Sequence, residues 1–243
     1  FAMHGVKRKT AAERDVEKEK AKLAAAAKFN DVANLILKHK KDGKRDEEAL
    51  QLTMKALEIN PEFYSAWNFR REILRDRLKR AMEEESHEGK KEGGEGREGG
   101  GGREEARGDE EEKKTGEGRS EMKKLLGKEL ELLAGGIERN AKAYCLWTHR
   151  LWTVDQLLAL EDEEVLSKEL SLCDSFLRAD ERNFHCWDYR LAIARRRQLT
   201  VEEELKFTTT KVNANFSNYS AWHHRSRFLS AMAAPQKGGG GEE

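Results

Sequence analysis

Proline is almost absent from this sequence, with only Pro61 and Pro235 among 243 residues. Because proline breaks helices and marks many turns of β proteins, its scarcity favours long helices. Strand-like alternation of apolar and polar residues is also nearly absent, while apolar residues recur at intervals of three and four. The sequence therefore predicts an all-α fold.

Cysteines and long apolar runs are also scarce. Cys145, Cys173 and Cys186 form no C-x-x-C pair, are odd in number and lie among helical apolar residues, so we expect free thiols in a reducing compartment. No apolar run is long enough to cross a bilayer. These features predict a cytoplasmic protein that does not insert into a membrane.

Net charge gives no indication of a charged partner. Lys plus Arg equals Asp plus Glu at 46 each, which provides no argument for nucleic acid or for an anionic membrane. The seven histidines show no credible ligand spacing with Asp, Glu or Cys. We therefore expect no metal site in this chain. Because the net charge is balanced, a basic binding site would have to be a local cluster of basic residues.

One internal segment differs sharply in composition from the rest. Residues 83–120 contain eleven glycines, fourteen acidic and eight basic residues, and Ala106 is the only apolar side chain. Such a segment buries too little surface to offset its ordering entropy, which predicts a disordered insertion. The expected organisation is an N-terminal helix and first repeat in residues 1–82, the insertion in 83–120, three further repeats in 121–233 and a flexible tail in 234–243.

Four tryptophans anchor an internal repeat. They are separated by 80, 40 and 35 residues. When the insertion is left out, the first separation falls to roughly 40 residues, which is close to the other two. An Asn or Asp stands seven positions before each tryptophan, an aromatic three before it and an arginine three after it. The tryptophans are Trp67, Trp147, Trp187 and Trp222; the Asn or Asp residues Asn60, Asn140, Asp180 and Asn215; the aromatics Tyr64, Tyr144, Phe184 and Tyr219; the arginines Arg70, Arg150, Arg190 and Arg225.

Each repeat is expected to be a helical hairpin. A leucine seventeen residues before each tryptophan and an aliphatic residue ten before it lie on one stripe of an earlier helix. We expect the Asn or Asp to cap the second helix, whose tryptophans pack in the core and whose arginines join neighbouring hairpins. Stacked hairpins curve into a solenoid, here an all-α, right-handed α-α superhelix, preceded by a long helix over residues 10–40.

These repeats resemble those of protein prenyltransferase α subunits. The resemblance rests on Asn60-Pro61-Glu62-Phe63-Tyr64-Ser65-Ala66-Trp67-Asn68-Phe69-Arg70 and its three counterparts. The start Met3-His4-Gly5-Val6-Lys7-Arg8-Lys9 and the segment 180–190 are similar to Rab geranylgeranyltransferase (type II) α subunits. Cys145 stands where the α subunit shared by farnesyltransferase and type I geranylgeranyltransferase usually has Gln, which favours the Rab enzyme.

The resemblance implies a subunit that is inactive without a β subunit. The enzyme would transfer geranylgeranyl from geranylgeranyl diphosphate to C-terminal cysteines of Rab GTPases, which a Rab escort protein presents. It places the Zn²⁺ and the lipid pocket in the β subunit. In this chain it implies that Lys142 and His185 stabilise the leaving diphosphate, and that Tyr144 and Asn183 line the α face of the cleft.

Alternatives to these assignments remain open in the sequence. Lys142 could be a solvated surface lysine, and His185 a packed histidine hydrogen-bonded within the solenoid. The whole chain could be the α subunit of the other two enzymes, or a non-enzymatic helical-repeat scaffold that binds peptides. The Trp-anchored pattern argues against the scaffold, whereas the absence of a self-contained catalytic set in this chain favours it.

Overall fold

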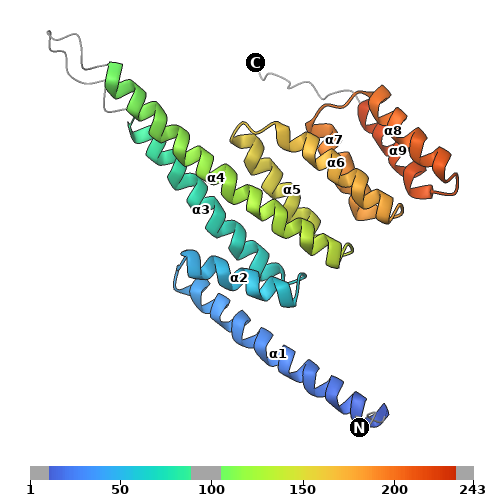
Figure 1. Ribbon diagram of the computed structural model, residues 1–243, viewed down its shortest axis with the longest axis horizontal. Helices are drawn as coiled ribbons and strands as arrows, with labels where there is room; N and C mark the ends of the chain where they lie inside the picture. Colours follow the sequence, from blue (N-terminus) through green and yellow to red (C-terminus); the bar gives the residue numbers. More distant parts are fainter. Residues whose placement is uncertain (1–10, 89–104, 234–243) are drawn as a thin grey trace, which may run out of the picture. The chain divides into compact units, whose positions relative to one another are not determined.

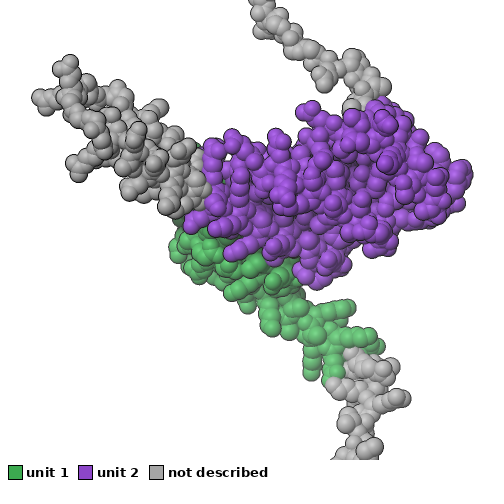
Figure 2. All heavy atoms as spheres, turned by 45° about the horizontal axis from the view of Figure 1, so that its top comes forward, with its two compact units in different colours: residues 1–80 green, residues 81–243 purple. Residues whose placement is uncertain are grey.

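The computed structural model describes residues 11–88 and 105–233, and all regular structure in these ranges is helical (Figure 1). This confirms the expected all-α fold. The chain divides into two compact units, residues 1–80 and 81–243 (Figure 2). The helices are α1 (Ala11–Lys41), α2 (Glu47–Ile59), α3 (Tyr64–Glu88), α4 (Glu105–Arg139), α5 (Tyr144–Ala159), α6 (Glu164–Ala179), α7 (Phe184–Arg196), α8 (Val201–Ala214) and α9 (Tyr219–Ala233).

The first unit contains the long N-terminal helix and the first hairpin. Helix α1 packs against α2, and the connection between them uses Gly43 at a left-handed φ of 68°. Asp46 then caps α2, because its side chain accepts a hydrogen bond from the N–H of Ala49 at 2.9 Å. Arg70 joins α3 to α2 by donating to the Leu50 carbonyl and to Thr53, both at 3.0 Å.

The second unit stacks three helical hairpins, α4/α5, α6/α7 and α8/α9 (Figure 1). We number the hairpins one to four along the chain, hairpin one being α2/α3. In the second unit the two helices of each hairpin pack together, and the second helices α5, α7 and α9 pack side by side in sequence. The predicted repeat of helical hairpins is therefore present.

The Asn or Asp of each repeat does not cap the second helix, so that prediction was wrong. The second helices begin four residues later, at Tyr64, Tyr144, Phe184 and Tyr219. Asn60, Asp180 and Asn215 instead end the first helices, and their side chains accept the N–H two residues ahead at 3.0–3.1 Å. The hydrogen bond of the side-chain oxygen is therefore made within the turn and not to a helix N–H. Pro61 lies in this turn and not in the helix.

The tryptophans hold this turn closed. Each indole N–H donates to the carbonyl oxygen six residues earlier, at 2.8–3.0 Å, and these acceptors are Pro61, Ala141, Glu181 and Phe216. The first three tryptophans are only 2–3% exposed, as predicted for core residues. Trp222 is 39% exposed and departs from that prediction.

Residues 83–120 are not wholly without structure. Helix α3 extends to Glu88 and α4 begins at Glu105, so the expectation of an unstructured insertion was wrong for residues 83–88 and 105–120. Glu, Lys and Arg are good helix formers, and a helix that continues from a packed segment needs no apolar face of its own. Residues 1–10, 89–104 and 234–243, including the predicted tail, lie outside the described residues.

Two further expectations can be compared with the structure. All three cysteines are buried and free. No helix in the described ranges is both long and apolar enough to cross a membrane.

A buried glutamate joins the two helices of each hairpin in the second unit. Glu129, Glu169 and Glu204 stand eighteen residues before the tryptophans of their repeats and are 1–3% exposed. Each carboxylate bonds the side chain two residues after that tryptophan: His149 at 2.8 Å, Tyr189 at 2.7 Å and His224 at 2.7 Å, respectively. Hairpins two, three and four therefore share a motif in which a buried Glu of the first helix is hydrogen-bonded to a His or Tyr of the second helix.

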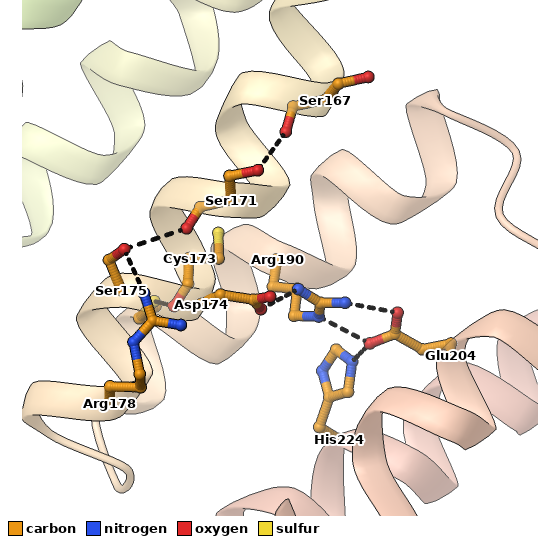
Figure 3. Close-up of polar contacts among 10 residues, drawn as sticks. Ser167, Ser171, Cys173, Asp174, Ser175, Arg178, Arg190, Glu204 and His224 are labelled. Carbon is orange, nitrogen blue, oxygen red and sulfur yellow. Dashed lines mark hydrogen bonds and ion pairs between the residues drawn. The ribbon is translucent and has the colours of Figure 1, made fainter. Parts of the chain in front are cut away.

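The repeat arginines reach these glutamates from the preceding hairpin. Arg150 donates to both carboxylate oxygens of Glu169, at 2.6 and 2.7 Å. Arg190 bonds both oxygens of Glu204, at 2.9 and 3.1 Å, and also Asp174 at 3.0 Å (Figure 3). The prediction that these arginines join neighbouring hairpins is confirmed for Arg150 and Arg190.

Candidate functional site

Lys142 and His185 meet where hairpin two packs on hairpin three. Lys142 is exposed in the turn before α5, and His185 is the half-buried second residue of α7. The backbone of Lys142 lies close enough to the His185 imidazole to favour the charged form of the ring. Among the residues that the structure describes, no carboxylate lies within ion-pair distance of the Lys142 ammonium. The cation is therefore available to an external anion.

A shallow pocket of about 230 Å³ opens beside His185. The ring of Tyr144 lies 6.0 Å from the His185 ring, and Phe184 covers the imidazole at 3.9 Å between ring centres. One wall belongs to α5 and the other to α7, the two helices that start at this place. The pocket is lined by Tyr144, Trp147, Thr148, Leu151, His185, Asp188, Tyr189 and Ala192.

The starts of two helices add to the electrostatics of this place. Lys142 lies two residues before α5, and His185 lies in the first turn of α7. Unpaired N–H groups and the helix dipole make a helix N-terminus favourable for an anion. The Asn183 amide donates to the Ala141 carbonyl, so the start of α7 lies beside the turn that precedes α5. The arrangement suits a diphosphate.

The surroundings of His185 favour its neutral form. Burial lowers the pKa of its imidazole, and this outweighs the Asp188 carboxylate and the Lys142 backbone, which both favour the charged form. A neutral imidazole has one N–H donor and one acceptor nitrogen. Protonation would supply both a second donor and a positive charge.

Asn183 does not line the pocket. It is 7% exposed, its side-chain oxygen caps α7 by accepting from the Cys186 N–H at 3.1 Å, and its amide donates to the Ala141 carbonyl at 3.3 Å. Asn218 makes the equivalent contacts one repeat later, with Ala221 and Glu181. The recurrence indicates a structural contact between hairpins, which holds the turn that carries Lys142.

Lys142 and His185 both depart from the repeat pattern. The other repeats have Glu62, Arg182 and Ser217 at the position of Lys142, and Ser65, Cys145 and Ser220 at the position of His185. By contrast, the ring at the position of Tyr144 recurs in all four repeats and is 57–80% exposed each time. Because Lys142 and His185 do not recur in the other repeats, the stacking of the hairpins does not require them, and they can serve a single site.

Sequence reasoning missed Asp188, which lines the pocket one helical turn after His185. A carboxylate here would repel a diphosphate, but Arg227 of hairpin four forms an ion pair with it. The signal that could have found the pair is weak, since Asp188 immediately follows Trp187 and no repeat spacing marks Arg227. Arg227 therefore reduces the negative charge at the pocket.

The pH dependence of His185 provides a test of this geometry. Because burial lowers its pKa, nuclear magnetic resonance should show His185 titrating below the pKa of histidine in an unfolded peptide. Added pyrophosphate should raise this pKa, since an anion favours the charged ring, and pyrophosphate affinity should therefore rise as pH falls through it. Asp188→Asn should lower the pKa further. A titration at or above the peptide value, or one that pyrophosphate leaves unchanged, would contradict the assignment.

Comparisons with known proteins agree with the repeat. The family model described as "Protein prenyltransferase alpha subunit repeat" matches residues 46–76, 126–157, 166–197 and 201–232. These four blocks fall on the four hairpins and together cover just over half of the chain.

Similar proteins include the geranylgeranyl transferase type-2 subunit alpha of several organisms. The proteins of Mus musculus and Homo sapiens are each 32% identical over 228 residues, covering 93% of this chain and 33% of the relative. That of Saccharomyces cerevisiae is 28% identical, covering 95% of this chain and 60% of the relative. The chain thus spans about a third of the length of the mammalian relatives.

Among solved structures, Candida albicans protein geranylgeranyltransferase-I complexed with GGPP aligns with 85% of this chain and 68% of its own. Its sequence identity of 19% and TM-score of 0.41 are too low to bear on the site. The four matched blocks and the four hairpins lead to one conclusion: this chain belongs to the protein prenyltransferase alpha subunit repeat family.

Proposed function

We propose that this chain serves as the α subunit of a Rab geranylgeranyltransferase and acts only together with a β subunit. The observation that carries the proposal is the proximity of Lys142 to the His185 imidazole at the starts of α5 and α7, with no ion pair from the Lys142 ammonium to a described carboxylate. The names of the similar proteins support the type of transferase.

The chain's own residues would act on the leaving group. When a cysteine sulfur forms its bond to C1 of geranylgeranyl diphosphate, the C1–oxygen bond breaks and its electron pair leaves with the diphosphate. Negative charge grows on those oxygens as the bond stretches, and preorganised donors at that place lower the barrier. The Lys142 ammonium would supply charge, and a protonated His185 would supply a second charged donor.

The remaining chemistry is proposed to belong to the partner. A Zn²⁺ ion in the β subunit would keep the substrate cysteine as a thiolate at neutral pH. The lipid pocket would also lie in the β subunit, which fits the modest size of the pocket beside His185. The protein substrates would be Rab GTPases bound to an escort protein, and the reaction would take place in the cytoplasm.

Association with β subunits tests the proposal directly. Co-expressed with the β subunit of a Rab geranylgeranyltransferase, the chain should elute as a stable heterodimer in size-exclusion chromatography. Co-expression with the β subunits of farnesyltransferase and type I geranylgeranyltransferase gives the matched control and should leave it unpaired. Pairing only with the latter two would assign the chain to those enzymes. A lack of pairing with all three would favour a non-enzymatic scaffold.

A further inference from the structure

A group of three potential metal ligands lies at the junction of α1 and α2, far along the chain from Lys142 and His185. His39 is in the last turn of α1, Asp46 is the N-cap of α2, and Glu48 is in the first turn of α2. One ring nitrogen of His39 and one carboxylate oxygen from each acid lie within 4.8 Å of one another. The loop that turns back at Gly43 brings them together.

His39 has an unsatisfied nitrogen in this place. The residue is only 7% exposed, and its Nδ1 has no hydrogen-bond partner although it is shielded from solvent. A buried polar atom without a partner costs free energy, so native proteins rarely keep one without a reason. A bound cation would give an imidazole nitrogen its missing partner.

The two carboxylates also lack a cation among the described residues. Asp46 uses one oxygen to cap α2, through the Ala49 N–H, and no ion pair to Asp46 or Glu48 is formed. The basic neighbours are engaged with α3 instead: Lys40 bonds Glu72 at 2.8 Å and Arg45 bonds Asp76 at 2.5 Å.

Glu47, which lies between Asp46 and Glu48 in the sequence, does have a basic partner. Glu47 pairs with Arg77 at 3.0 Å and accepts from Gln51 at 2.8 Å, and these hydrogen bonds lower the pKa of Glu47 against the effect of its slight burial. Lys40, Arg45 and Arg77 are thus paired with other acids, and among the described residues no basic side chain pairs with Asp46 or Glu48.

From this arrangement we propose that His39, Asp46 and Glu48 bind a divalent transition-metal ion, with Zn²⁺ as the reference ion. One imidazole and two carboxylates are a donor set that zinc accepts, and water completes the coordination. A magnesium or calcium ion prefers oxygen ligands alone, so the imidazole selects against both. The ion would tie the end of α1 to the start of α2.

The spacing of residues along the sequence does not point to this group of ligands, for a topological reason. His39 and Asp46 are seven residues apart, but a helix end, a loop and a helix start lie between them. No helical or strand periodicity relates such positions, so spacing along the chain does not reveal that their ligand atoms converge.

Titration of the whole chain with Co²⁺ and Zn²⁺ tests the proposal. We expect one equivalent of Co²⁺ to give the intense visible absorption of a low-coordinate site, Zn²⁺ to displace it, and Zn²⁺ to raise the melting temperature. Glu48→Gln should weaken binding at least about tenfold, since even indirect supports of a metal site cost that much. Glu58→Gln places the same substitution at an exposed position on the same helix and should leave binding unchanged.

His39→Ala should abolish the Co²⁺ spectrum, but it alters a buried residue. Circular dichroism therefore has to show that this variant is folded, and the exposed Glu48→Gln variant carries the test if it is not. Equal Co²⁺ affinity in the Glu48→Gln and Glu58→Gln variants would overturn the proposal. So would weak binding at several histidines without a saturable single site.

Discussion

Lys142→Ala is expected to lower the rate of prenyl transfer about 10²- to 10³-fold in a reconstituted heterodimer, with little change in protein stability. Removing one preorganised donor from a developing oxyanion has a cost of that size. Because Lys142 is exposed and forms no ion pair with a described residue, truncating it leaves no buried group unsatisfied. The measurement is single-turnover transfer of a labelled geranylgeranyl group at saturating diphosphate.

Two further variants show whether the effect comes from charge at this place. Lys142→Arg retains the cation and should recover a large part of the rate. Lys128→Ala removes an exposed lysine from α4 and should leave the rate unchanged. If Lys142→Ala stayed within about twofold of the unmodified enzyme, the proposed role on the leaving group would be lost, although the subunit assignment would still depend on the β-subunit experiment.

Glu169→Ala is expected to reduce the free energy of unfolding by about 3–5 kcal/mol, because it leaves a buried charge without its partner. Arg150 is 3% exposed and donates to Glu169 through two nitrogens, and the Tyr189 hydroxyl donates to the same carboxylate at 2.7 Å. Burial and Glu169 together raise the pKa of Tyr189 well above its usual value, so the hydroxyl keeps its proton. Urea unfolding followed by circular dichroism measures the loss.

Glu164→Ala is the matched control on the same helix. Glu164 is exposed and, among the described residues, pairs only with Lys168 at 3.2 Å, one turn away, so its loss should cost less than about 0.5 kcal/mol. The triple change Arg150→Met, Glu169→Leu and Tyr189→Phe replaces the whole polar group and should restore most of the stability, as apolar replacement of a buried ion pair often does. Equal losses for Glu169→Ala and Glu164→Ala would show that the pair contributes no more than a surface contact.

The four-hairpin repeat could be predicted from sequence because its spacing is regular. Tryptophan, arginine and the aliphatic stripe recur at fixed offsets, and burial then follows from helical periodicity. The role of Asn60 and its counterparts was not predictable in this way, since the same side chain can cap a helix or close a turn. Only the bond to the amide two residues ahead, instead of three, distinguishes the two.

The buried glutamates could have been found with one more comparison. Repeats with Glu eighteen residues before the tryptophan have His or Tyr two residues after it, whereas the first repeat combines Ala49 with Phe69. This exchange of a polar pair for an apolar pair predicts contact between the two positions. A hydrophobicity pattern alone treats the glutamates as solvent-facing, because it does not consider paired burial of charge.

At the candidate site, the sequence proposed residues but gave no information on their surroundings. The structure brings Lys142, Tyr144 and His185 together, whereas Asn183 is buried beneath the turn. The pairing of Asp188 with Arg227 joins two hairpins whose relative rotation no spacing rule specifies. Contacts within a repeat follow from its offsets, and contacts between repeats depend on how the hairpins stack.

Trp222 gives the chain an intrinsic fluorescence signal at its last hairpin. Trp147 packs on Phe176 and Tyr189 of the next hairpin, and Trp187 on Phe207 and His224, whereas the described ring contact of Trp222 is with Phe216 of its own turn. Its indole is therefore accessible to a soluble quencher such as iodide, while Trp67, Trp147 and Trp187 are shielded and Trp152 on α5 is half-buried. Trp152→Phe removes the contribution of that half-buried indole. Any helix or partner that covers hairpin four would reduce this quenching, so its docking can be followed without a label.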